Sequence, residues 1–150
     1  MMTKNKNKNK NGFTIIELLV VLAIAVFILS IVFVSVRSAK AKGRDARREE
    51  DIKQLQNALN IYNVNSRVFP ACALGVITGE SDCLSLALKS DSIVGSVSTD
   101  PLGGGTGVCL DAASHVYCYE SANGLTYTLR YNLETDTIPG KSSGWQQVNP

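Results

Sequence analysis

The longest apolar run, residues 18–36, constrains the fold of this chain more than any other feature. Its 19 residues carry no charge, and only Ser30 and Ser35 are polar. At a rise of about 1.5 Å per residue, a helix of this length approaches the ~30 Å hydrocarbon thickness of a bilayer. A buried helix in so short a chain is seldom apolar on every face. The run therefore predicts a membrane-embedded helix.

The helical pattern continues beyond the apolar run, and we expect one helix over residues 13–64. Residues 13–36 form its membrane-spanning part, and residues 37–64 form an amphipathic continuation. Asn and Pro residues then supply stop signals. The apolar stripe of the amphipathic part consists of Ile52, Leu55, Leu59 and Tyr62.

Residues 65–150 are expected to form a head with a small antiparallel β-sheet, which gives an α+β fold class. A short helix over residues 82–89, capped by Ser81 or Asp82, should interrupt a long irregular connection. Strands are expected at 115–120 and 125–133, with a hairpin turn at Asn123-Gly124. Residues 108–110 are a candidate third strand, and the tail after Glu134 is expected to be irregular, with Trp145 folding back.

Alternation in the second strand defines which face is buried. We expect that face to pack on the apolar stripe of the helix. Its residues are Leu125, Tyr127, Leu129, Tyr131 and Leu133.

All four cysteines follow the apolar run, at Cys72, Cys83, Cys109 and Cys118. An even number confined to one region favours two disulfides formed in an oxidising compartment. Zinc is the competing interpretation, but the spacings are not those of common zinc ligands. Three connectivities are open; we favour the local pairs, Cys72 with Cys83 and Cys109 with Cys118.

Basic residues flank the apolar run on both sides and leave its orientation ambiguous. Four Lys precede it, and the positions that follow it carry six Lys or Arg, so the positive-inside rule would place the C-terminal side in the cytoplasm. Disulfides would not persist there. We therefore predict a single-pass protein of the cytoplasmic membrane with its N-terminus inside and its C-terminus outside.

The N-terminal segment has an unusual order for a secretory signal, whose cleavage site normally follows the apolar region. Here the basic residues 1–12 end in Gly12, and the apolar run starts at once. The string Gly-Phe-Thr-Ile-Ile-Glu at residues 12–17 resembles the processing site of type IV pilins and type II secretion pseudopilins. The resemblance implies that a prepilin peptidase removes residues 1–12, cutting after Gly12, and methylates the new N-terminal Phe13.

Glu17 places a carboxylate at the start of the apolar helix. Insertion of such a charge costs about 2.5–3.5 kcal/mol, so it needs a partner. No basic residue lies one helical turn away, but cleavage creates a positive amine at Phe13. The resemblance implies that Glu17 pairs with such an amine between subunits and sets the axial register of a filament.

The resemblance extends loosely over residues 43–62, 100–101, 117–119 and 127–134, with two departures. Many major pilins have Pro at the position of Val34 and a small residue at the position of Val26. The local melting of the helix that some pilus filaments show is therefore in question for this chain. The alternative is a helix that stays continuous.

A charge run covers residues 44–51 and has two interpretations of equal weight. Its members pair with neighbouring helices or contact lipid phosphates, or they form a solvated face with weak i,i+4 pairs such as Arg47–Asp51. The run comprises Arg44, Arg47, Arg48, Glu49, Glu50 and Asp51.

No catalytic constellation is recognised, so we predict that the chain is not an enzyme. His115 stands alone, and Gly103-Gly104-Gly105 lacks the Lys-Ser/Thr of a phosphate-binding loop. No metal or cofactor is predicted, with one weaker alternative, a calcium site. That site would use Asp100, Asp111, Glu120 and Asp136.

The charge of the rear part argues against direct nucleic-acid binding. Residues 70–150 hold eight acidic and three basic residues, a balance of −5. DNA phosphates would be repelled by this region.

The sequence therefore predicts a pilin, a structural subunit of a type IV pilus-like filament at the cell surface. One alternative is a pseudopilin of a secretion or DNA-uptake machine, and another is a signal-anchored extracytoplasmic binding domain. The resemblance implies further partners: other copies of the chain, the prepilin peptidase, an assembly ATPase and a platform protein, and membrane lipid before assembly.

Overall fold

The computed structural model describes residues 12–150, apart from the side chain of Val34. The predicted leader therefore lies outside the described residues except for Gly12. The chain divides into two compact units, Met1–Ser38 and Ala39–Pro150, which are described separately below.

One helix, α1 (Ile15–Ser66), contributes to both units, which confirms the predicted long N-terminal helix. It passes through positions 26 and 34 without a break. Every described side chain from Gly12 to Phe33 is exposed, because nothing in the first unit packs against it. Among the described residues, α1 is the one helix long and apolar enough to cross a membrane.

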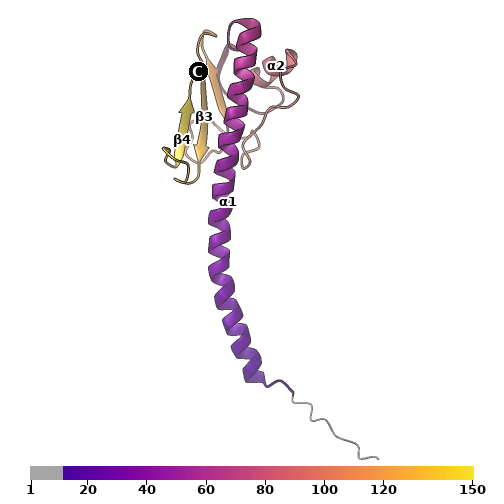
Figure 1. Cartoon of the computed structure of the whole chain (residues 1–150), viewed down its shortest axis with the longest axis vertical. Coiled ribbons are helices and arrows are strands. Elements are labelled where there is room, and N and C mark those ends of the chain that lie inside the picture. Colours follow the sequence, from indigo (N-terminus) through magenta and orange to yellow (C-terminus); the bar gives the residue numbers. More distant parts are fainter. Residues whose placement is uncertain (1–11) are drawn as a thin grey trace, which may run out of the picture. The chain divides into compact units, whose positions relative to one another are not determined.

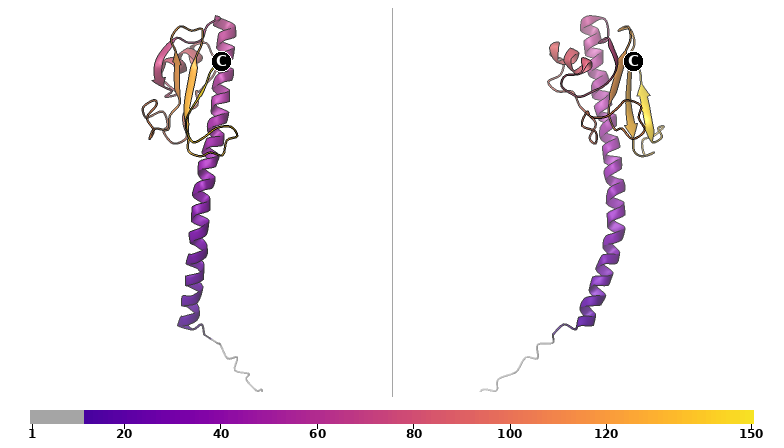
Figure 2. Two further views of the ribbon diagram at one scale, coloured as in Figure 1. Left: turned by 90° about the vertical axis from the view of Figure 1, so that its left-hand side faces the viewer. Right: turned by 180° about the vertical axis from the view of Figure 1, so that it is seen from behind.

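The second unit contains a four-stranded antiparallel sheet in the order of the chain, which confirms the α+β class (Figure 1). Its strands are β1 (Cys72–Val76), β2 (Cys118–Ser121), β3 (Thr128–Leu133) and β4 (Gly144–Val148). The short helix α2 (Cys83–Ser90) lies beside β1. Figure 2 shows the sheet alongside the second half of α1 from two further directions.

The core forms where the stripe of α1 meets the sheet, as predicted. Ile52, Leu55 and Leu59 are buried in one cluster with the inward side chains of β3, and Tyr62 packs against its margin. Those inward side chains are Leu129, Tyr131 and Leu133. Leu125 was expected to join them, but it is 69% exposed because it lies in a loop before β3.

Two strands were missed by sequence reasoning, and one predicted strand is absent. Residues 108–110 form turns and coil, whereas β1 and β4 occupy segments expected to be irregular. β4 has the sequence GWQQV, and β1 contains Gly75, so neither shows the alternation that marks a half-buried strand. Pairing with β2 and β3 holds them in extended form.

The predicted hairpin is present, but its connection is longer than a two-residue turn. Residues 122–127 join β2 to β3. Gly124 has φ +71°, and a Cβ there would lie 3.0 Å from the carbonyl oxygen of Phe69. The Ser121 hydroxyl accepts from the Gly124 N–H and donates to the Thr126 carbonyl. These bonds stabilise the loop that Asn123-Gly124 indicates.

The connection between α1 and the later strands is held by one cap and two disulfides. Asp82 is the N-cap of α2 and accepts from the Ser85 N–H at 3.0 Å, as predicted. The disulfides have the local connectivity favoured above: they join Cys72 to Cys83 and Cys109 to Cys118. In the tail, Trp145 donates from Nε1 to the Asp111 carbonyl at 3.0 Å.

Arg48 lies fully buried where α1 meets the loops of the head. Its Nε and Nη2 donate to the Asp100 carboxylate at 2.6 and 3.0 Å. Its Nη1 donates to Asp45 and to Glu134, both at 2.7 Å. One guanidinium therefore joins α1 to the loop before β2 and to the end of β3.

The other buried carboxylate of this group, Asp45, has its own donors. Backbone N–H groups of Glu134 and Thr135 donate to it at 3.0 and 2.8 Å. Burial alone would raise the pKa of Asp45, but these donors and Arg48 lower it below its ordinary value. The carboxylate therefore remains ionised inside the head.

Most members of the charge run are engaged inside the second unit, so the run is not simply a solvated face, although its predicted Arg47–Asp51 pair is present at 3.9 Å. Arg44 binds Glu134, Asp51 accepts from the Tyr117 hydroxyl at 2.9 Å, and Glu49 is bound by Lys141. These side chains serve to attach the head to α1. The sequence could not show this because the partners lie 66 to 92 residues away.

We expect Arg48→Met to destabilise the second unit by about 3–5 kcal/mol, because the buried carboxylates of Asp45 and Asp100 lose their cation. Urea unfolding of the full chain in micelles, followed by fluorescence of the single Trp145, measures the change. Arg47→Met is the matched control, because the Arg47 side chain is 70% exposed. Equal unfolding midpoints for the two variants would contradict the role assigned to Arg48.

Acid should weaken the same attachment. The guanidinium of Arg44, and then that of Arg48, lowers the pKa of Glu134 from an ordinary 4.5 to about 2. The unfolded chain therefore binds a proton that the folded chain rejects, and the free energy of unfolding should fall as pH drops from about 4.5 towards 2. Urea midpoints at several pH values measure this. Glu134→Gln should flatten the dependence, whereas Glu50→Gln, which alters an exposed acid, should not.

Candidate processing and assembly site

The first turn of α1 is closed by a reciprocal pair of side chains, Thr14 and Glu17. The Glu17 Oε2 accepts from the Thr14 backbone N–H at 2.9 Å and from the Thr14 hydroxyl at 2.7 Å. The Glu17 N–H in turn donates to the Thr14 hydroxyl at 3.3 Å. This is a capping box, in which a Thr and a Glu three residues later satisfy N–H groups that the helix leaves unpaired.

The capping box determines where the helix begins. Thr14 stands outside the helix, and Ile15 is its first residue. Gly12 and Phe13 therefore lie in non-helical, exposed chain. The peptide bond between them is free of helical hydrogen bonds and accessible to another protein.

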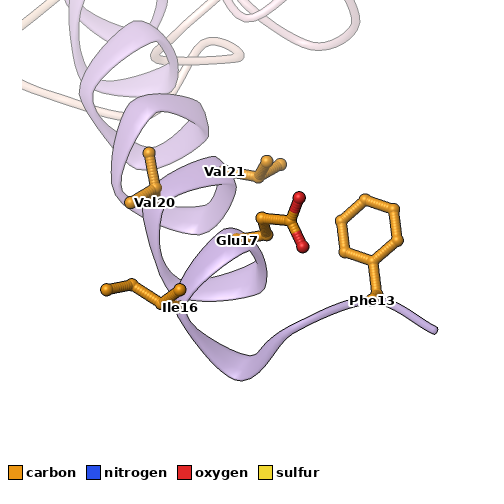
Figure 3. A pocket seen from close by; sticks show the side chains of 5 residues that line it. All are labelled: Phe13, Ile16, Glu17, Val20 and Val21. Atoms are coloured by element: carbon orange, nitrogen blue, oxygen red, sulfur yellow. The ribbon is translucent and has the colours of Figure 1, made fainter. Parts of the chain in front are cut away.

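Phe13 lies beside the Glu17 carboxylate in an open apolar recess at the start of α1. Figure 3 shows the Phe13 ring facing that carboxylate and Val21, with Ile16 and Val20 to the left of the helix in this view. These five side chains line the recess. Phe13 is 80% exposed, so its ring is available to a partner.

Gly12 has no structural reason to be glycine within the described chain. A Cβ at this position would meet no atom within 4 Å. A requirement for glycine at this position would then come from whatever binds the segment rather than from the fold. Such a requirement suits a protease that must admit the backbone closely.

Residues 7–35 match the model of the prokaryotic N-terminal methylation motif. The chain has a prepilin-like class III signal peptide. The match covers the end of the basic leader, the residues Gly12, Phe13 and Glu17, and most of the apolar run. It supports a type IV pilin-like or pseudopilin protein in general, and with it prepilin peptidase processing and filament assembly.

The remaining comparisons add no relative. No curated protein matches the chain, and no solved structure matches it. The motif and the geometry of residues 12–21 are therefore the basis for any statement of function.

Thr14 is the residue of the prepilin-like signal peptide that sequence reasoning missed. The Thr-x-x-Glu pattern of a capping box was present at residues 14–17. The sequence offers Glu17 no positively charged partner before cleavage, and the uncharged donors of Thr14 were not considered. The structure shows that Thr14 supplies two donors to this carboxylate before any cleavage.

The four acids of the calcium hypothesis do not come together. Asp100 is bound by Arg48, Glu120 by Arg130, and Asp136 accepts from the Ser143 backbone. Asp111 accepts from the Ala113 N–H at 3.1 Å. Within residues 12–150, no group of three or more His, Cys, Asp or Glu side chains is placed to hold a metal ion.

We expect Thr14→Val to loosen the first turn of α1, because Glu17 loses its hydroxyl donor and its N–H loses an acceptor. Loss of a Thr cap costs about 1 kcal/mol, or roughly a fivefold gain in local opening. Amide hydrogen exchange at residue 14, Glu17 and Leu18, whose N–H groups are bonded in this turn, tests this on the full chain in micelles. Thr14→Ser keeps the hydroxyl and should exchange like the wild type; equal protection in all three would contradict the cap.

Proposed function

We propose that this chain is a pilin, a structural subunit of a type IV pilus-like filament. It is stored in the cytoplasmic membrane, cut between Gly12 and Phe13, methylated at Phe13, and assembled through the apolar part of α1. The observation that carries this proposal is a charged Glu17 at the start of a fully exposed apolar helix, five residues after the predicted cut.

The exposed apolar surface requires an apolar environment. From Ile15 to Phe33 the large side chains of α1 keep 50% or more of their surface free. Lipid covers such a helix before assembly, and neighbouring helices cover it in a filament. Because both environments are apolar, the free-energy difference between them is small, and an assembly ATPase acting through a platform protein can drive the transfer.

Glu17 supplies the register in this proposal. Its Oε2 receives both donors of Thr14, while no hydrogen bond from residues 12–150 reaches its Oε1. A free amine at Phe13 of a neighbouring subunit would find that oxygen available. A charge-assisted bond in an apolar filament core would hold adjacent subunits at one axial offset.

The second unit supplies the exposed part of the subunit. Its two disulfides suit an oxidising location outside the cytoplasm, and they support the proposed orientation with the N-terminus inside and the C-terminus outside.

The processing and assembly steps can be tested together in the native host. Mass spectrometry of the wild-type protein should show an N-terminus at Phe13 with one added methyl group, and shearing should release filaments. For Glu17→Ala we expect cleavage to continue and the filament yield to fall at least tenfold, because the register pair is lost. Glu50→Ala, which removes an exposed acid of the second unit, is the control and should assemble normally.

Two results would overturn the proposal. An intact leader on the mature protein would remove the prepilin peptidase step. Normal filament yield from Glu17→Ala would remove the register role and indicate another mode of assembly, whereas a wild-type protein that forms no filament would favour the signal-anchored binding domain.

A further inference from the structure

Two lysines of α1, Lys40 and Lys42, are exposed cations without a partner. Among residues 12–150, no hydrogen bond or ion pair involves the side chain of either one. Arg47 follows on the same helix and is 70% exposed, with its Nε at a distant 3.9 Å from Asp51. Lys40 and Lys42 form a short cationic segment, here called the collar.

Most acids that follow the collar on α1 are bound to other residues, so they do not neutralise it. Asp45 is fully buried and holds Arg48, and Asp51 is 6% exposed and accepts from the Tyr117 hydroxyl. Glu50 is the first exposed acid after the collar. Two other cations of this part of α1 are engaged: Arg44 binds Glu134, and Arg48 is surrounded by three carboxylates.

The collar follows the apolar run closely in sequence. Lys40 and Lys42 come four and six residues after Val36, the last residue of the uncharged run. A helix rises about 1.5 Å per residue, so they lie no more than roughly 6 and 9 Å past its end. Headgroups occupy about 5–8 Å on each side of the hydrocarbon, and lysine stems are flexible. Arg47 lies roughly 16 Å past the run, about two Debye lengths from the hydrocarbon edge, so its attraction to headgroups is largely screened and it is not counted in the collar.

Arg37 differs from the collar residues. Its guanidinium lies over the ring of Phe33, 4.8 Å from the ring centroid. This cation is therefore directed onto the apolar helix and is not counted in the collar.

We propose that Lys40 and Lys42 bind the headgroups of anionic phospholipids in the leaflet adjacent to the second unit. Phosphate-bearing lipids surround the helix at this depth and match exposed cations on either side of it, and each Lys near such a surface adds attraction worth about fivefold in affinity. The proposal depends on membrane insertion of α1 and not on cleavage or filament assembly. It holds whichever side of the membrane the second unit occupies.

The collar also explains a conflict in the charge pattern of the chain. If the second unit lies outside the cytoplasm, these cations stand on the side that the positive-inside rule disfavours. The positive-inside rule disfavours cations at this position. Binding of lipid headgroups would explain why the chain has them there. Binding there would also resist withdrawal of the helix from the membrane until assembly supplies other contacts.

Native mass spectrometry of the uncleaved full chain in micelles, with equal amounts of phosphatidylglycerol and phosphatidylcholine, tests the proposal. The wild type should retain phosphatidylglycerol preferentially. Lys40→Gln with Lys42→Gln should weaken that retention by roughly fivefold per lysine. Lys53→Gln with Arg67→Gln removes two exposed cations farther along the chain and is the matched control, which should retain the lipid.

Three outcomes would overturn the proposal. One is equal retention of phosphatidylglycerol by the two double variants, and another is no preference over phosphatidylcholine in the wild type. The third is lipid-independent pairing of two chains that Lys40→Gln with Lys42→Gln abolishes, which would assign the collar to the acidic surface of a second copy. Because the uncleaved chain is used, none of these outcomes depends on whether it forms filaments.

Discussion

The structure depends on an apolar helix surface that the chain itself does not cover. From Ile15 to Phe33 every large side chain of α1 is exposed, although folding normally buries such residues. A protein cannot leave a 19-residue apolar run in water, so lipid or other helices must complete the fold. Membrane storage and polymerisation are two solutions to this one constraint, and the prepilin-like signal peptide lies at the end of the helix where both begin.

The second half of α1 differs from the first, because many of its charged side chains are covered by the rest of the chain. Arg48 is fully buried with three carboxylates around it, and Glu49 and Asp51 bind residues of the sheet region. Buried ion pairs add little net stability but demand one geometry. Hydrophobic contacts alone would tolerate sliding of the sheet along the stripe, whereas these pairs fix one register. A head rigidly registered on its helix suits a subunit that must repeat identically.

Local patterns predicted the parts of the fold that local physics determines. The apolar run, the stripe of Ile52, Leu55 and Leu59, and the cap at Asp82 each follow from periodicity or from short-range hydrogen bonds. The edge strands β1 and β4 did not, because their extended form comes from pairing with distant segments. The Arg48 contacts were hidden for the same reason, since Asp100 and Glu134 lie 52 and 86 residues away. The role of Thr14 could have been predicted, because the Thr-x-x-Glu pattern of a capping box is local. It was missed because only charged partners of Glu17 were considered.

Charge and its neutralisation determine what each segment of α1 can contact. At the start, Thr14 partly satisfies Glu17 and leaves one carboxylate oxygen without a hydrogen bond from the described residues. In the middle, carboxylates engage Arg44 and Arg48, so the unpaired positive charge nearest the apolar run is that of the collar. If Arg44 and Arg48 were free, the basic segment would extend farther along the second unit and attract anions without regard to depth. Their engagement confines the positive charge to the residues that follow the apolar run, where lipid phosphates lie.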